Sequence, residues 1–215
     1  SGVLTAAPSA ASTIPAAPAS NPAFTVQPGP TTAGGTITPA IRVTARDALG
    51  NTVTSFVGNV TVAITAASGT PGATLSGTRT VAAVAGVATF STLSIDKSGT
   101  GYTLTATASG LADGFSASFT INPGTATHLA FTVQPVNTIA GATITPAVRV
   151  AAEDNFGNTV TGFTGTVTIA IGTNPAFGTL AGTKAVAAVG GVAVFSTLSI
   201  NNVGNGYTLA ATSTG

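Results

Sequence analysis

The sequence predicts an all-β protein built from two tandem antiparallel sandwiches. Three observations support this fold class: apolar side chains alternate with Thr and Ser at a period of two, no segment carries a 3.6-residue apolar stripe, and long stretches occur twice. Such alternation is typical of antiparallel strands that pack on one face only. Turn signals such as Pro-Gly, Leu-Gly-Asn and Ser-Gly separate the alternating runs by roughly the 8–12 residues expected in a sandwich.

The repeat sets the domain organisation. Residues 24–28 return as 131–135, residues 36–40 as 143–147, and residues 90–95 as 195–200. The copies begin 107 residues apart, which is the size of a whole domain, because solenoid repeats run only about 20–50 residues. We therefore expect a leader over residues 1–22, one domain over 23–123 and a second over 124–215.

Four alternating runs predict strands in the first copy. In chain order their apolar positions are Ile41, Val43 and Ala45; Val60, Val62 and Ile64; Tyr102, Leu104 and Ala106; and Phe115, Ala117, Phe119 and Ile121. The many Thr and Val residues are β-branched and suit a pleated surface. About seven or eight strands in ~100 residues are typical of an immunoglobulin-like sandwich, here without the cysteine pair or the tryptophan of antibody domains.

The two copies end differently. The first copy continues past Gly110 into the run that ends at Ile121, whereas the second copy reaches only Gly215, which aligns with Gly110. We therefore expect the second immunoglobulin-like sandwich to lack its own last strand.

The leader allows two interpretations. Its Ala, Pro and Ser content favours a stiff extended linker, but its apolar residues Val3, Leu4 and Ile14 would suit a strand donated to another sheet. Since Pro is confined to sheet edges and bulges, Pro8 leaves only residues 1–7 and 9–14 able to pair without interruption.

Composition excludes several classes of protein. The chain has 215 residues, of which six are Lys or Arg and five are Asp or Glu, a charged fraction of 5%, against roughly 25% in ordinary domains. This balance provides no basic surface for nucleic acid, and no apolar run is long enough for a transmembrane segment. Without cysteine, disulfides and thiolate metal sites are excluded.

The residues available for catalysis are few. His128 is the single histidine, has no counterpart in the first copy and is expected to be an exposed residue at the joint between the domains. Only Asp47 and Asp154 are acids at equivalent positions, and one acid in each domain does not make the paired acid and base that proton transfer needs. We therefore predict no catalytic residues, no cofactor and no enzymatic activity.

One short motif occurs in both copies. Its members are Asp47, Gly50 and Asn51 in the first copy, and Asp154, Gly157 and Asn158 in the second. The structural interpretation is a tight turn, in which Asp accepts main-chain N–H groups and Gly and Asn tolerate positive φ. The alternative is a calcium site with Asp47, Glu153 and Asp154 as candidate ligands, but calcium takes six to eight oxygens, so we rank it second.

The spaced pattern of these positions carries a family resemblance. Its members in the first copy are Asp47, Gly50, Asn51, Val53, Gly58, Val60, Leu75, Gly86, Val87, Ala88, Phe90, Gly101, Tyr102, Leu104 and Ala106, and the pattern returns between Asp154 and Ala210. It resembles the bacterial immunoglobulin-like repeats of the invasin and intimin type. The resemblance implies a secreted or cell-surface sandwich that serves as a stalk, spacer or fibre element and is not an enzyme.

These expectations lead to three ranked hypotheses. The first is a structural subunit that polymerises head to tail with copies of itself, the leader of one chain filling the open groove of its neighbour. A chain that starts at Ser1 without a signal-type segment favours this hypothesis, because it suggests a processed N-terminus. The second is a set of spacer repeats from a longer surface adhesin. A glycan-binding module ranks third, since Tyr102 and Tyr207 are expected to face inward; a ligand on a host or other surface stays open.

Overall fold

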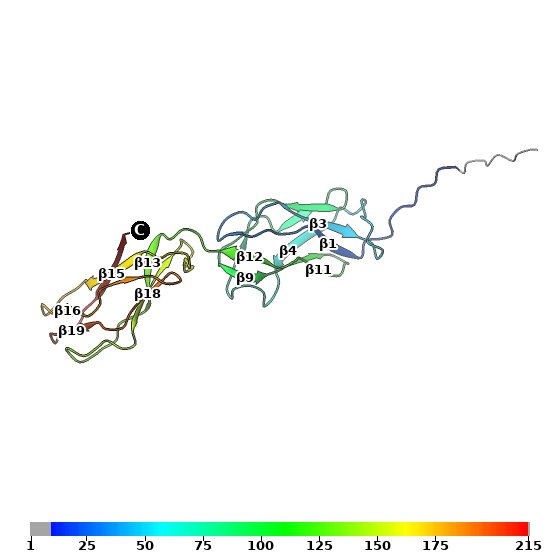
Figure 1. The fold of residues 1–215 in the computed structure, drawn as a ribbon. Helices are drawn as coiled ribbons and strands as arrows, with labels where there is room; N and C mark the ends of the chain where they lie inside the picture. The colour runs from blue at the N-terminus through cyan, green and yellow to red at the C-terminus, as the bar shows by residue number, and fades with distance from the viewer. Residues whose placement is uncertain (1–9, 215) are drawn as a thin grey trace, which may run out of the picture.

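The computed structural model describes residues 10–214, and this part of the chain forms strands, turns and loops but no helix. None of these residues therefore lies in a helix with the length and hydropathy needed to cross a membrane. Two sandwiches follow one another along the chain and lie end to end, joined by a short connector between β12 and β13 (Figure 1). The predicted all-β fold class is confirmed.

The first sandwich contains twelve short strands. They are β1 (Asn21–Val26), β2 (Thr31–Thr32), β3 (Ile41–Arg46), β4 (Asn59–Ile64), β5 (Leu75–Ser76), β6 (Thr80–Ala82), β7 (Val87–Phe90), β8 (Ser94–Ile95), β9 (Gly99–Tyr102), β10 (Leu104–Ala108), β11 (Gly114–Phe115) and β12 (Phe119–Asn122). The first of them starts at Asn21, inside the range expected for the leader.

Two layers form the first sandwich. One sheet has the order β1-β3-β7, and the other has the order β11-β10-β4-β6, with the β2-β12-β9 sheet beside it. Only one residue separates β9 from β10 and only three separate β11 from β12, so the two sheets follow directly on one another along these chain segments. The β2–β12 pair is parallel, whereas only antiparallel pairs were expected.

The alternation in the sequence becomes the inside and outside of this sandwich. Along β4, Val60 and Val62 are buried and the residues Asn59, Thr61 and Ala63 are exposed. Two aromatic residues pack together in the core between the layers. Tyr102 is fully buried and Phe119 nearly so, and their ring centroids lie 5.9 Å apart. Both layers therefore contribute to one continuous hydrophobic core.

The second sandwich contains fewer strands. They are β13 (His128–Val133), β14 (Val148–Glu153), β15 (Thr166–Ile171), β16 (Leu180–Ala181), β17 (Ala185–Ala187), β18 (Val192–Phe195), β19 (Ser199–Ile200) and β20 (Leu209–Thr214). Its sheets have the orders β13-β14-β18 and β17-β15-β20, with a β16-β19 ribbon. Among the described residues, no strand corresponds to β2, β9, β11 or β12 of the first sandwich, so β20 is an edge strand.

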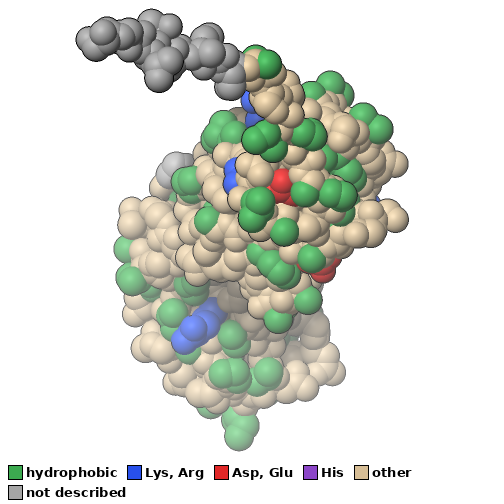
Figure 2. All heavy atoms as spheres, turned by 90° about the vertical axis from the view of Figure 1, so that its right-hand side faces the viewer, with side chains coloured by type: hydrophobic (Ala, Val, Ile, Leu, Met, Phe, Trp, Pro, Cys, Tyr) green, Lys and Arg blue, Asp and Glu red, His purple; other side chains and the backbone are tan. Residues whose placement is uncertain are grey.

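Charged side chains are sparse on the surface. Figure 2 looks onto the end of the first sandwich where the leader joins it, and the charges there are isolated spots among polar and apolar atoms. No strongly charged face is visible from this side. Contacts with another macromolecule here would depend on hydrogen bonds and apolar packing more than on charge.

Candidate functional site

A groove lies open in the second sandwich of the described residues. Its walls are the loop 135–140, the loop 202–206, and Ile144, Tyr207 and Leu209, and it encloses about 600 Å³. The corresponding space in the first sandwich holds β12, whose Phe119 and Ile121 side chains are buried. The groove therefore occupies the place that β12 fills in the first sandwich, and no strand among residues 10–214 fills it.

Side chains at equivalent positions show how far the core is open. Tyr102 and Leu104 are fully buried in the first sandwich. Their counterparts Tyr207 and Leu209 are only half-buried, and both line the groove. The inward orientation expected for the two tyrosines thus holds fully for Tyr102 and partly for Tyr207.

A polar atom marks the same opening. In the first sandwich, Tyr102 Oη donates a hydrogen bond to the carbonyl oxygen of Lys97 at 2.8 Å. Tyr207 Oη is also buried, but it has no hydrogen-bond partner among the described residues. Buried polar groups are normally paired, so the groove wall is incomplete in its hydrogen bonding as well as in its packing.

The rim of the groove is more apolar than its counterpart in the first sandwich. Val136, Ile139 and Val203 are 51%, 80% and 85% exposed, respectively. The first copy has Gly29, Thr32 and Ser98 at these positions. A monomeric sandwich gains nothing from these exposed apolar groups, whereas a docked chain would cover them.

The backbone at the groove edge is also free to pair. In the first sandwich β10 lies between β4 and β11, and Ser116 accepts a hydrogen bond on its Oγ from the N–H of Leu104 at 2.8 Å. In the second sandwich β20 pairs with β15 alone, within the part of the chain that the structure describes. An edge strand of this kind is a template for another strand.

The repeated aspartate motif forms a hydrogen-bonded turn. Asp47 Oδ1 accepts from the N–H groups of Leu49 at 3.0 Å and Asn51 at 2.8 Å. Its Oδ2 accepts from Asn51 Nδ2 at 3.0 Å and from the N–H of Ala17 at 3.1 Å. The Asn51 side-chain bond lowers the pKa of Asp47; burial acts in the opposite direction, and the three main-chain bonds lower the pKa further.

The second copy repeats this turn with a different environment. Asp154 accepts main-chain N–H groups from Phe156 at 2.9 Å, Asn158 at 3.0 Å and Gly124 at 2.8 Å. Burial raises the pKa of Asp154, but the side-chain and main-chain bonds from Asn158, with those from Gly124 and Phe156, outweigh it and leave the pKa lowered. The carboxylates therefore act as ionised acceptors that fix the turns.

The calcium candidates do not gather into a cluster. Glu153 Oε2 lies 3.6 Å from His128 Nε2 on the neighbouring strand. Asp47 and Asp154 belong to different sandwiches and face N–H donors. Among residues 10–214, no group of three or more His, Cys, Asp or Glu side chains comes together to hold a metal ion.

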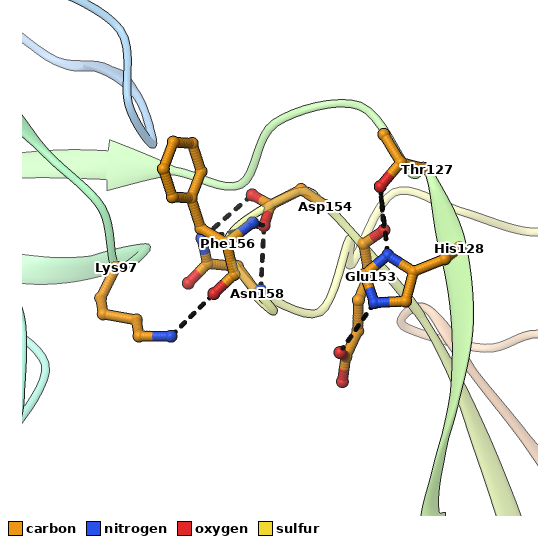
Figure 3. A network of polar contacts seen from close by, with 7 residues as sticks. All are labelled: Lys97, Thr127, His128, Glu153, Asp154, Phe156 and Asn158. Carbon is orange, nitrogen blue, oxygen red and sulfur yellow. Dashed lines mark hydrogen bonds and ion pairs between the residues drawn. The ribbon is translucent and has the colours of Figure 1, made fainter.

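The turn of the second copy also forms the joint between the sandwiches, which Figure 3 shows. Asn158 accepts from the N–H of Ser98 on its Oδ1 at 2.9 Å and donates from its Nδ2 to the carbonyl of Asp96 at 2.9 Å. Lys97 Nζ donates to the carbonyl of Phe156 at 2.7 Å. The joint was not predicted from the sequence, because two of its three bonds use main-chain atoms of the 96–98 loop.

The remaining predicted residues lie apart from the joint contacts or outside the described range. Val3 and Leu4 fall outside the described residues. Ile14 is 91% exposed and lies in no strand. The side chain of His128, at the start of β13, is 51% exposed.

Among known proteins, similarity to this chain was found in solved structures. No family model matches the sequence, and neither does any curated protein. The Escherichia coli adhesin FdeC matches with 18% identity and a TM-score of 0.38 over 84% of this chain and 55% of that chain. A β-glycosidase from Bacteroides vulgatus matches with 12% identity and a TM-score of 0.38, over 90% of this chain and 23% of that chain.

A chimeric tandem of titin domains matches with 14% identity and a TM-score of 0.25, over 89% of this chain and 97% of that chain. This chain spans about 55% of the adhesin chain. An adhesin and a glycosidase match equally well, so these similarities favour no activity.

Proposed function

We propose that this chain is a non-enzymatic structural element of an extracellular bacterial surface fibre, in which a neighbouring chain donates its leader to the groove of the second sandwich. The observation that supports the proposal is the open groove beside β20, whose outer edge has no partner strand among the described residues. Strand addition supplies both missing components at once, because main-chain bonds satisfy the edge and alternate side chains fill the core.

The leader has the sequence that this seat requires. Residues 9–14 align with residues 116–121 at the same offset of 107 that relates the two copies, and four of the six positions are identical, namely Ser9, Ala10, Thr13 and Ile14. In the first sandwich, Ser116, just before β12, and Ile121 in β12 are both buried. Residues 9–14, hereafter the donor segment, therefore carry the same two residue types that bond to β10 and fill the core in the first sandwich, and could do so beside β20 in the second.

The donor segment differs from β12 where the groove differs from its counterpart. Ser12 stands at the position of the large Phe119. The smaller Ser12 is offset by larger side chains on the groove rim, because Val136 and Ile139 stand where the first copy has the smaller Gly29 and Thr32. Total side-chain volume, more than residue identity, determines whether a core is filled.

The residues after the donor segment already follow the path of an internal connector. The N–H of Ala17 bonds to Asp47 Oδ2 at 3.1 Å, as the N–H of Gly124 bonds to Asp154 Oδ2 at 2.8 Å. The N–H of Ser20 bonds to the carbonyl of Arg46, which repeats the bond from Thr127 to Glu153. The leader thus approaches the first sandwich as the connector approaches the second.

The test is the association of the full chain, measured by sedimentation velocity over a concentration series and by electron microscopy. Wild-type chains are expected to form linear assemblies. Ile14→Asp is expected to block them, because it places a carboxylate in the position of a buried isoleucine. Ala11→Asp is the matched control, since the corresponding Ser118 is exposed; if the two variants assemble alike, strand donation is wrong.

A second candidate function is supported by the same sequence match. A donor segment at the repeat offset is also expected if these sandwiches are spacer modules in a longer adhesin, where the strand comes from the same chain. Wild-type chains that remain monomeric at every concentration would favour this alternative.

A further inference from the structure

We infer that the Asp47–Asn51 turn is an interaction surface for a second copy of this chain, which it binds at the groove end of that copy's second sandwich. The contact would reproduce the internal joint between the two sandwiches. This inference rests on the proposed head-to-tail function and adds to it a second interface, made by folded parts of both chains.

The internal joint provides the template. Its two Asn158 bonds end on main-chain atoms, the N–H of Ser98 and the carbonyl of Asp96. The ring of Phe156 packs over Gly34, where an added Cβ would overlap it. These contacts leave Asn158 6% exposed and Phe156 43% exposed.

The first sandwich presents the same turn without this cover. Asp47 makes the same pattern of bonds to its turn as Asp154 does. Leu49, at the position of Phe156, is 86% exposed, and Asn51, at the position of Asn158, is exposed. The surface is thus preformed and carries an apolar group and an amide in the arrangement that the joint uses.

The groove end of the second sandwich presents the complementary half. Gly141 occupies the position of Gly34 with a similar backbone, φ being +79° and +74°. A Cβ added at Gly141 would meet nothing within 4 Å among the described residues. The space that Phe156 occupies over Gly34 is therefore open over Gly141. Ile139 and Val203, which line the groove, are exposed, and both suit contact with Leu49.

The chemistry of the joint tolerates the sequence changes between the copies. Asn201 and Val203 stand where the first copy has Asp96 and Ser98. Because the Asn158 bonds use only the main chain at those positions, Asn51 can make the same two bonds to residues 201 and 203. The one side-chain contact that is lost is that of Lys97, which becomes Asn202.

The surface also fits the path of the donor segment. Residues that follow it are bonded to Asp47 through Ala17, so a leader seated in a groove brings its own Asp47–Asn51 turn to the end of that sandwich. A heterologous contact of this type does not close on itself and extends linearly.

The experiment compares association constants of full-length variants by sedimentation. Leu49→Asp is expected to weaken association by roughly tenfold or more, as truncation of a central contact does. Leu49→Phe installs the residue of the internal joint and is expected to strengthen association severalfold. Val84→Asp is the matched control, because Val84 is 78% exposed and its counterpart Val189 stays 82% exposed in the second sandwich, where the internal joint is formed.

The outcomes separate this inference from the strand donation on which it builds. If wild-type chains associate and Leu49→Asp behaves like Val84→Asp, the interface is wrong and strand donation stands. If Leu49→Asp weakens association whereas Ile14→Asp does not, the interface is supported and strand donation is wrong. Wild-type chains that never associate overturn both.

Discussion

The open core predicts that equivalent leucines contribute very differently to stability. Leu104 is fully buried, and its replacement by alanine would leave a cavity that costs about 2–5 kcal/mol. Leu209 is half-buried and already faces the groove, so Leu209→Ala creates no new cavity and loses about 1 kcal/mol of apolar burial. For a domain of this size, these losses correspond to shifts of the thermal midpoint by about 8–40 °C for Leu104→Ala and about 4–8 °C for Leu209→Ala.

Differential scanning calorimetry of the two variants measures these shifts, at a protein concentration low enough for the chain to be monomeric. At concentrations where chains associate, a seated donor segment would bury Leu209, and the cost of Leu209→Ala is expected to rise toward that of Leu104→Ala. Equal losses in the monomer would refute the reasoning, because they would mean that the core around Leu209 is closed without a further strand.

Three further predictions concern polar groups. Tyr102→Phe removes a hydrogen bond and is expected to cost about 1 kcal/mol in denaturant unfolding, whereas Tyr207→Phe costs nothing, since its hydroxyl is unpaired among the described residues. The two turn aspartates have lowered pKa values, so their stabilisation is complete above the ordinary carboxyl pKa of about 4 and is lost as the pH falls through the lowered values. Thermal midpoints should therefore be flat between about pH 7 and 5 and fall below about pH 4. Asn158→Ala is expected to loosen the joint and broaden the distance distribution in small-angle X-ray scattering, and Asn51→Ala should leave that distribution unchanged in the monomer.

Features that depend on local pattern were predictable from the sequence. The alternation around Val60 and Val62 gives the buried face of β4, and the offset of 107 residues gives two copies of one sandwich. The comparison of Gly215 with Gly110 also predicted that no strand equivalent to β11 or β12 would follow β20 among the described residues. These features follow from side-chain periodicity and repetition, which a single sequence displays directly.

Features that depend on main-chain contacts between distant segments were not predictable. The parallel pair of β2 with β12 joins Thr31 to Ile121, and the two-residue strand β2 is too short to show any alternation. The joint relies on the main chain of residues 96 and 98, which leaves no signature in side-chain type. The match between residues 9–14 and 116–121 was present in the sequence, but Ser12 in place of Phe119 obscures it.

In the proposed assembly the two ends of the molecule are complementary. At one end, no described residue fills the groove or covers Gly141; at the other end, Leu49 is exposed and residues 9–14 match the sequence of residues 116–121. Neither deficiency involves a charged group. Contacts built from main-chain hydrogen bonds and apolar packing are little affected by ionic screening, so a low charge content is compatible with an assembly that holds over a wide range of salt concentrations. Under the proposed assembly, the scarcity of charge and the open edge of β20 would serve the same end-to-end association, which would then depend little on ionic strength.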